Sequence, residues 1–205
     1  EGNDHITIDN NDIRDVSLVA TPNNAILSAG STGTPALYNN NIVISNNNIL
    51  NFYNTTGNIA GVIATQGSSD WIISGNNFNH TFSGTPKSIS GSFSVIDAYN
   101  SQMENFTINN NFIGGTSALT SGGNINIIGS GVMRLFNLSL NPAVVNNING
   151  NTIWNIIYIT SQSSPLHSVF NLADGAYNVG TVAGNIIGSP TTQGNIALAI
   201  GGFGA

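Results

Sequence analysis

Residues 39–49 read NNNIVISNNNI, two runs of three asparagines around a short apolar segment. Asparagine favours turns and is a poor residue for the interior of a helix or a strand. The chain nevertheless holds 35 asparagines among its 205 residues, together with 24 glycines. Such heavy use of a turn-forming residue indicates a turn that the chain makes many times, and the same motif does recur along the sequence.

Six segments share one pattern. Each opens with Ile or Val, closes five residues later with Ile or Phe, and has Asn at the third position after the opening residue, preceded by Asn or Gly. The segments are IDNNDI (8–13), ISNNNI (44–49), ISGNNF (73–78), INNNFI (108–113), INGNTI (148–153) and VAGNII (182–187). The repeated asparagines are Asn11, Asn47, Asn76, Asn111, Asn151 and Asn185. The opening residues lie 29 to 40 residues apart, a spacing typical of a solenoid with loops of variable length.

A second apolar segment comes before most of these motifs. Examples are GVIATQ (61–66), SVIDAY (94–99), RLFNLSL (134–140) and VFNLAD (169–174). Each repeat is therefore interpreted as two strands, a turn that carries the Asn, a further apolar strand, and a loop rich in Ser, Thr and Gly. Helical periodicity is hard to find anywhere in the chain.

These repeats predict a right-handed parallel β-helix of about six or seven coils, one for each repeat. Inward Ile, Val and Phe side chains stack into an apolar column, and successive coils lie about 4.8 Å apart. The repeated Asn lies at the turn between two strands, where Asn and Gly tolerate a left-handed backbone. Stacked amides can hydrogen-bond along the axis, so we expect the six asparagines to form one ladder. Residues 1–205 are expected to be a single domain.

The charge content limits the classes of function. The chain has three Lys and Arg residues against nine Asp and Glu residues, a net charge of −6, and no cysteine. A nucleic-acid partner is not expected, because no basic surface is available to displace counterions. Without cysteine there are neither disulfides nor thiolate metal sites. No apolar run approaches the ~18 residues of a membrane-spanning helix, so membrane insertion is not expected either.

Two stretches, NFTINNNFIGGTSA (105–118) and VFNLADGAYNVGTVAGNIIGSP (169–190), resemble one group of proteins. They are similar to the right-handed β-helix regions of very large cell-surface proteins from Bacteroidota, and the resemblance covers nearly the whole chain. It implies export by the type IX secretion system to the bacterial outer surface. It also implies that this chain is an internal piece of a longer protein, whose neighbouring domains and secretion machinery are its partners, with no cofactor.

The ends of the chain fit the same interpretation. No capping helix precedes the first repeat, and residues 194–205 read GNIALAIGGFGA, an apolar strand followed by glycines. The end of a solenoid exposes strand edges and an open core unless a distinct cap covers it. We therefore expect the isolated chain to aggregate or to associate end to end.

The expected function is a non-enzymatic rigid stalk or display scaffold of a secreted adhesin, with surface glycans as possible ligands. The alternative is a polysaccharide lyase, a hydrolase or a polysaccharide-binding domain on the same fold. Glycoside hydrolysis needs two carboxylates about 5 to 9.5 Å apart. The candidate acids are Asp9, Asp12, Asp15, Asp70, Asp97, Glu104 and Asp174. Asp70, Asp97 and Glu104 can approach one another on adjacent coils, but they fall at different phases of the repeat, so no catalytic residue is predicted.

The segment DNNDIRD (9–15) is the one metal candidate. Asp9, Asp12 and Asp15 can offer oxygen ligands to Ca²⁺. The interpretation we favour pairs Arg14 with Asp12 or Asp15 at the surface, a contact worth about 0 to 1 kcal/mol.

Three further residue types have a structural interpretation. His5, His80 and His167 have no second His or Cys at ligand spacing, and we expect them at the surface or in loops. Trp71 and Phe106 each lie two residues before an opening Ile, which predicts stacking in the core rather than a sugar-binding platform. Thr precedes the opening residue in only three of six repeats, too few for the flat Thr array of an ice-binding solenoid.

Overall fold

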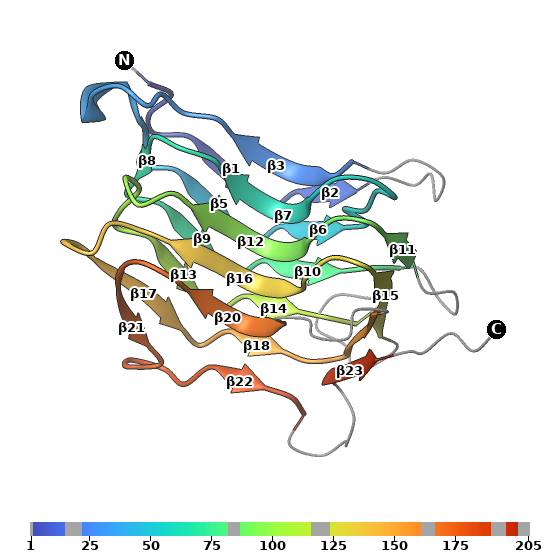
Figure 1. The fold of residues 1–205 in the computed structure, drawn as a ribbon. Coiled ribbons are helices and arrows are strands. Elements are labelled where there is room, and N and C mark those ends of the chain that lie inside the picture. The colour runs from blue at the N-terminus through green and yellow to red at the C-terminus, as the bar shows by residue number, and fades with distance from the viewer. Residues whose placement is uncertain are drawn as a thin grey trace.

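The computed structural model of the chain describes residues 2–14, 22–81, 87–115, 124–160, 167–189 and 196–200. For residues 197–200 it describes the backbone only. In this part of the chain nearly all regular structure is β-strand, and the helical content is one short 3₁₀ turn, η1 (Pro35–Leu37). All strand pairs among these residues are parallel (Figure 1). The all-β, parallel character predicted from the repeats is therefore confirmed.

The described strands form five parallel sheets, and successive coils each contribute a strand to the larger ones. Sheet A contains β1 (Thr7–Asp9), β5 (Val43–Ser45), β9 (Ile72–Ser74), β13 (Thr107–Asn109), β17 (Val145–Asn149) and β21 (Ala176–Val179). Sheet B contains β2 (Asp12–Arg14), β6 (Asn48–Leu50), β10 (Asn77–Asn79), β14 (Phe112–Ile113), β18 (Thr152–Ile153) and β22 (Ile186–Ile187). The Asn turn connects each strand of sheet A to the next strand of sheet B.

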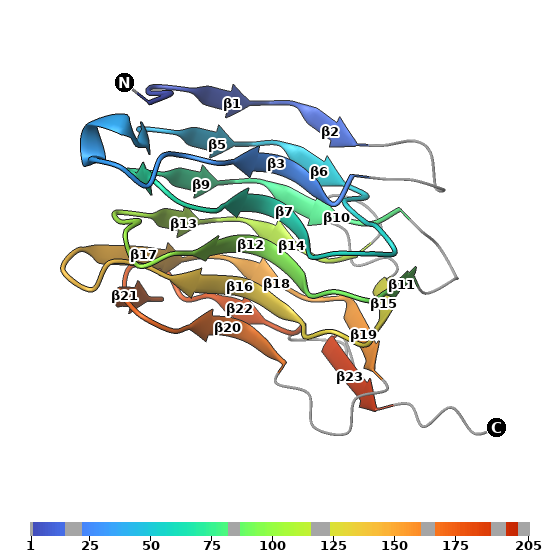
Figure 2. The ribbon, with the colours of Figure 1, turned by 45° about the horizontal axis from the view of Figure 1, so that its top comes forward.

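Sheet C is formed by the second apolar segments. It contains β3 (Asn24–Ser28), β7 (Ile59–Ala64), β12 (Phe93–Tyr99), β16 (Arg134–Ser139) and β20 (Ser168–Leu172). A two-stranded sheet D, formed by β4 (Asn39–Asn40) and β8 (Ser68–Ser69), lies on the path back to sheet A. Figure 2 shows sheet C in one layer and sheets A and B in another. This stacking is consistent with a parallel β-helix.

Sheet E was not predicted. It contains β11 (Lys87–Ile89), β15 (Ile125–Gly129), β19 (Ile156–Thr160) and β23 (Ile196–Ile200), and it lies between sheets B and C along the chain. The repeat pattern predicts a long loop here. In the coil of β18 and β19, however, only Trp154 and Asn155 separate the two strands, so β19 occupies residues that were expected to belong to the loop.

The register of sheet A follows the repeat. Ile8 aligns with Ile44, Ile44 with Ile73, Ile73 with Ile108, and Ile108 with Ile148. Four of these five opening residues have an exposed fraction of 0 to 1%, and only Ile8, in the first strand, is half-buried. The prediction that opening residues stack in an apolar column is therefore confirmed for five of the six segments.

The prediction for the opening residue of the sixth segment was wrong. Val179, not Val182, aligns with Ile148, and the Val182 side chain is 88% exposed. In the other segments three steps separate the opening residue from the ladder Asn, whereas six steps separate Val179 from Asn185. The three extra residues form a bend that starts at Gly180, which has a φ of 70°. Val182 therefore lies outside the apolar column.

The core fills the space between the layers. Its largest fully buried side chains include Trp71, Tyr158, Phe52 and Phe78. Trp71 stacks on Phe106 with ring centroids 5.6 Å apart and an interplanar angle of 17°. Both side chains are 1% exposed, so the predicted core stacking of these two rings is confirmed.

Candidate functional site

The amide of Asn76 illustrates the contacts of the repeated asparagine. Its Nδ2 donates to Oδ1 of Asn111 at 3.0 Å and to the carbonyl oxygen of Ile44 at 2.8 Å. Its Oδ1 accepts from both the backbone N–H and Nδ2 of Asn47, each at 3.0 Å. The side chain is fully buried, and its donors and acceptor are satisfied by these four hydrogen bonds.

All six predicted asparagines belong to one ladder. The Nδ2–Oδ1 distances along it are 3.0 Å for Asn11–Asn47, Asn47–Asn76, Asn76–Asn111 and Asn111–Asn151, and 2.9 Å for Asn151–Asn185. Every step has the same direction, because each amide donates to the following coil. Asn185 keeps its place despite the bend before it, and it also donates to the carbonyl oxygen of Ile148 at 2.9 Å. The ladder is a structural element and offers no free group to a ligand along its buried length.

The left-handed residue of the turn is the one before the ladder Asn. Asn10, Asn46 and Asn110 have φ of 55°, 54° and 54°, and Gly75 and Gly150 have φ of 64° and 66°. This conformation explains the Asn or Gly of the first five segments, whereas Gly184 of the sixth segment does not have a positive φ. The ladder position itself requires Asn because its side-chain amide both donates and accepts hydrogen bonds between coils.

Asp70 and Glu104 lie next to each other on adjacent coils, beside sheet D. The N–H of Asp70 donates to the carbonyl oxygen of Glu104 at 3.1 Å. Each carboxylate accepts from an asparagine of the following coil: Asp70 from Asn105 at 2.5 Å, and Glu104 from Asn141 at 2.7 Å. The two acids therefore continue the pattern of amide contacts between coils.

Asp97 lies apart from these two acids, in β12 of sheet C. Burial raises the pKa of the Asp97 carboxyl, while a hydrogen bond from Asn137 at 3.2 Å and the positive charge of Arg134 oppose that rise. Asn171 in turn donates to Asn137 at 2.8 Å. Of the three acids considered together, the structure places Asp70 and Glu104 side by side and Asp97 in a different sheet.

The calcium candidate is divided between two sheets. Asp9 lies in β1 and accepts from Ser45 at 2.6 Å and Asn46 at 2.9 Å, contacts that lower the pKa of its carboxyl. Asp12 lies in β2 and is 3.8 Å from Arg14, so the predicted surface ion pair is confirmed. Asp15 lies outside the described residues. Among the residues that are described, no group of three or more His, Asp or Glu side chains could hold a metal ion.

The histidines behave differently from one another. His5 is exposed, and His167 is half-buried and accepts from the N–H of Met133 at 2.8 Å. His80 follows β10 in a connection between strands, as expected, but it is only 1% exposed and therefore lies in the core and not at the surface. Its ring packs against Phe52 and Phe93 with centroids 4.9 and 5.9 Å away, and burial lowers its pKa to about 3. The sequence signal was the period-two alternation that places His80 on the same side as the buried Phe78.

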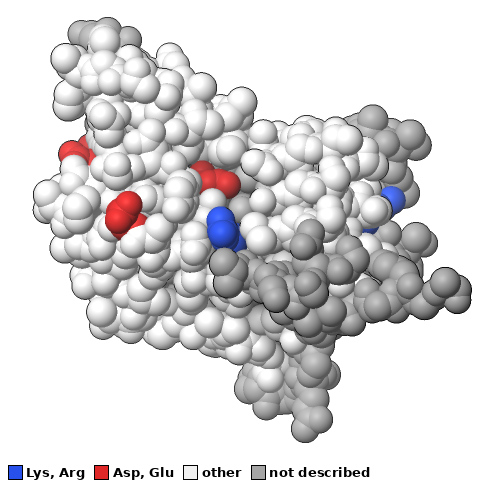
Figure 3. All heavy atoms as spheres, in the orientation of Figure 1, with Lys and Arg blue, Asp and Glu red and all other residues white. Residues whose placement is uncertain are grey.

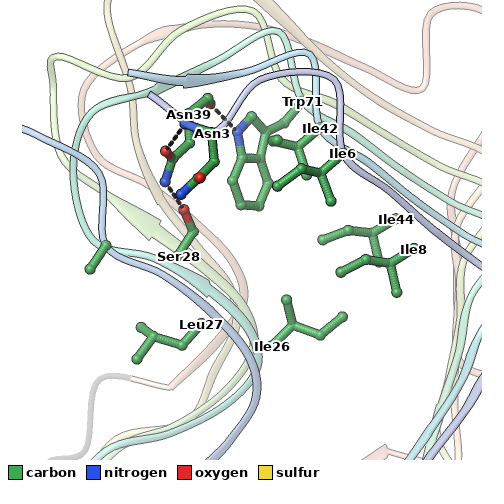
Figure 4. Close-up of a pocket in the computed structure, with 11 residues that line it drawn as sticks. Asn3, Ile6, Ile8, Ile26, Leu27, Ser28, Asn39, Ile42, Ile44 and Trp71 are labelled. Atoms are coloured by element: carbon green, nitrogen blue, oxygen red, sulfur yellow. Dashed lines mark hydrogen bonds between the residues drawn. The ribbon is translucent and has the colours of Figure 1, made fainter. Parts of the chain in front are cut away.

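An apolar hollow of about 190 Å³ opens at the N-terminal end of the core, between sheets A and C (Figure 4). Its lining includes Ile6, Ile8, Ile26, Ile42 and Ile44, together with Trp71. It forms because the column that contains Trp71 and Phe106 continues toward the N-terminus with the smaller residues Ile42 and Ile6. Ile6 and Ile42 also lie two residues before an opening Ile, so the sequence contains the signal for this difference in size.

Asn39 closes the polar side of this hollow. Its carbonyl oxygen accepts from Nε1 of Trp71 at 2.9 Å, and its Nδ2 donates to Oγ of Ser28 at 2.8 Å. Its Oδ1 accepts from the N–H of Asn3 at 3.0 Å. Figure 4 shows these polar groups together on one side of the hollow and the isoleucines on the other.

Comparisons with known proteins add no assignment: no family model, no curated protein and no solved structure matches the chain. Within the described part, no helix has the length and apolar character needed to cross a membrane. Charged side chains are sparse on the face shown in Figure 3.

Proposed function

We propose that this chain is a right-handed parallel β-helix that serves as a non-enzymatic, rigid stalk or display scaffold of a large secreted cell-surface protein. The observation that carries the proposal is the ladder from Asn11 to Asn185, which links six coils by hydrogen bonds of one direction that are buried in the middle steps and part-buried at the two ends. At about 4.8 Å per coil, six coils form a rod about 30 Å long. A repeating network in which the hydrogen-bonding groups of the backbone and side chains are satisfied internally suits a rigid spacer that holds other domains at a distance.

The arrangement of the acids supports a scaffold over an enzyme. Glycosidases present two carboxylates to one bond, and one of them carries a raised pKa. Here Asp97, with its raised pKa, lies in sheet C, whereas Asp70 and Glu104 lie beside sheet D and are bonded to Asn105 and Asn141. Three basic residues in the whole chain also leave few candidates for the base of a lyase.

The proposed setting is the outer surface of a bacterium, as a segment of an adhesin exported by the type IX secretion system. Its proposed partners are the neighbouring domains of the parent chain, the secretion machinery and surface glycans. This part of the proposal rests on the resemblance of residues 105–118 and 169–190 to β-helix regions of Bacteroidota surface proteins.

Activity assays test the enzymatic alternative. The purified chain would be incubated with a panel of neutral and acidic polysaccharides, and reducing ends and unsaturated products would be measured. A scaffold releases neither above the level of a heat-denatured control. Turnover that is lost in Asp70→Asn, Asp97→Asn or Glu104→Gln, with the fold of the variant retained, would contradict the proposal.

A further inference from the structure

The outer face of sheet C carries a second, shorter row of polar contacts between coils. Asp97, Asn137 and Asn171 lie directly opposite one another in β12, β16 and β20. Nδ2 of Asn171 donates to Oδ1 of Asn137 at 2.8 Å, and Nδ2 of Asn137 donates to Oδ1 of Asp97 at 3.2 Å. The Asp97 carboxylate is therefore held by an amide and not by a cation.

Arg134 lies near this row, at the start of β16. Leu135 and Phe136 are consecutive, yet both are 0% exposed. Strand β16 therefore departs from strict alternation there, and Arg134 reaches the outer face together with Asn137 and is half-buried. The positive charge of Arg134 opposes the rise in the pKa of Asp97, so the two side chains are close enough to interact through their charges.

The chain has three basic residues, and two of them have a partner. A nitrogen of the Arg14 guanidinium lies 3.8 Å from a carboxylate oxygen of Asp12. Nζ of Lys87 lies 5.7 Å from the centre of the Tyr53 ring. The guanidinium of Arg134, in contrast, forms no hydrogen bond or ion pair with any described residue. Its charge and its N–H donors are therefore available to a ligand.

Together with His167, Ser168 and Asn171, Arg134 lines a pocket of about 200 Å³, which we call the Arg134 pocket. Ser168 lies opposite Arg134 in β20, and its hydroxyl forms no hydrogen bond with the described residues. Nδ1 of His167 accepts from the N–H of Met133 at 2.8 Å, and burial lowers the pKa of the ring, so the positive charge at neutral pH is that of Arg134. Coils stack along the axis, so coils before or after the described ones would leave this outer face open.

We propose that the Arg134 pocket binds the anionic group of an acidic sugar, with Arg134 as the charged partner and Ser168 as a second donor. A guanidinium presents paired N–H donors to the oxygens of a carboxylate or a sulfate. An engineered cavity of roughly 150 Å³ takes up benzene, so a pocket of about 200 Å³ has room for one sugar ring. The inference rests on the proposed role of surface glycans as partners and names their class, whereas the scaffold role does not require it.

Three monosaccharides that differ in one substituent test the proposal: methyl glucuronide, methyl glucoside, and the sulfate ester of methyl glucoside at its primary hydroxyl. Each would be titrated into the isotope-labelled full chain, and the NMR shifts of the backbone amides would report where and how tightly it binds. We expect saturable shifts at Arg134, Ser168 and their neighbours with at least one anionic sugar. The neutral glucoside lacks the charge-assisted hydrogen bonds, so we expect it to bind at least about tenfold more weakly.

The comparison of the two anionic sugars identifies the group that the pocket recognises, because the one that binds more tightly carries that group. Binding of the neutral glucoside as tight as that of the anionic sugars would overturn the proposal. Absence of binding by all three sugars would overturn it as well.

Matched variants of the protein separate the pocket from the overall charge of the chain. Arg134→Gln removes the charge but keeps an amide donor, and we expect it to weaken binding of the anionic sugar about tenfold or more. Arg14→Gln removes the same charge from β2, where Arg14 pairs with Asp12, and is expected to bind like the natural chain. Thermal unfolding would check that both variants keep the fold. Equal affinities of the two variants, or shift changes away from the pocket, would overturn the proposal.

Two milder variants keep the test valid if Arg134→Gln loses the fold. Arg134→Lys retains the charge without the paired donors, and we expect it to bind the anionic sugar less tightly than the natural chain does. Ser168→Ala removes one hydroxyl and is expected to weaken binding by a smaller factor than the loss of the charge. Unchanged affinity in both would overturn the proposal. If the sugars fail to bind while the chain still cleaves no polysaccharide, the pocket proposal alone is overturned and the scaffold proposal stands.

Discussion

Asn76 donates two hydrogen bonds to a single atom of Asn111: its backbone N–H and its Nδ2 each lie 3.0 Å from Oδ1 of Asn111. The same arrangement repeats between Asn111 and Asn151, at 3.1 and 3.0 Å. Because the amide must accept at one atom and donate at another, a carboxylate cannot replace it. A buried carboxylate would face the oxygen atoms that the amide nitrogen now contacts.

Replacement of Asn111 by Val is expected to lower the free energy of unfolding by about 1 to 3 kcal/mol, because hydrogen bonds of Asn76 and Asn151 lose their partner inside the core. Asn111→Asp is expected to cost at least as much at neutral pH. Urea denaturation would measure both. Asn58→Asp, at an exposed position, keeps the oxygen that accepts from the N–H of Ser92 at 3.2 Å, so it serves as the control and is expected to change stability by less than about 0.5 kcal/mol. An Asn111→Val protein as stable as the control would contradict the ladder's energetic role.

The left-handed turn makes a separate prediction at Asn110, which is exposed and has a φ of 54°. Asn110→Ala is expected to destabilise the fold by about 1 kcal/mol, because Cβ is disfavoured in this region and Ala lacks the local hydrogen bonding of Asn. Asn110→Gly is expected to be nearly neutral, since Gly75 and Gly150 occupy the same position in other coils. Thermal unfolding of the two variants side by side would measure the difference, and an Ala variant as stable as the Gly variant would refute the assignment.

Close approach of consecutive coils predicts the effect of a methyl group at Gly91. A Cβ at this position would overlap the carbonyl oxygen of Gly57, and one at Gly131 would overlap that of Gly91. We expect Gly91→Ala to cost about 1 to 3 kcal/mol or more, because both neighbours are backbone and cannot rotate away. Gly184→Ala is the matched control, since nothing lies within 4 Å of the added methyl group. Equal urea midpoints for the two variants would show that the coils are not packed as described.

His80 predicts a pH dependence of stability. Its pKa is lowered from 6.5 to about 3 in the folded chain, by burial first and by the charge of Lys87 second. The folded state therefore disfavours the protonated ring, and stability that is complete above pH 6.5 is lost as the pH falls toward 3. Between pH 7 and 5, where most carboxylates remain ionised, we expect the free energy of unfolding to fall in the natural chain. We expect it to fall less steeply in His80→Phe, where His167, whose pKa is also lowered by burial, still contributes.

The control for this prediction is His5→Asn. His5 is exposed and has a φ of 60°, a conformation that Asn tolerates, so this variant removes a histidine without changing the core. We expect it to keep the pH dependence of the natural chain. If His80→Phe kept the same slope, the loss of stability would have to come from another group.

The sequence predicts those features that depend on a repeated local requirement. The ladder asparagines and the Asn or Gly before them recur at fixed positions, so each coil provides an independent copy of the signal. Trp71 and Phe106, which stack on each other, likewise occupy the same position in two repeats. Sheet C was predicted for the same reason, because its segments precede the Asn motif regularly.

Features that occur once were predicted less well. The bend after Val179 shifts Val182 out of the core, and one coil alone cannot reveal an insertion whose ends still match the motif. Burial of His80 depends on the ring of Phe52, which comes from the preceding coil, and on that of Phe93 in β12. The hollow arises from the difference in size between Ile42 and Trp71, a property of packing between coils and not of either residue alone.

Hydrogen exchange of the asparagine side-chain amides, followed by NMR, tests the central claim most directly. The account predicts that the NH₂ groups of Asn47, Asn76, Asn111 and Asn151 exchange only when the fold opens, because each donates to the next ladder oxygen at 2.9 to 3.0 Å. The exposed Asn58 is expected to exchange at the rate of a free amide. Ladder amides that exchange as fast as that of Asn58 would contradict the claim that a continuous asparagine ladder holds the coils together.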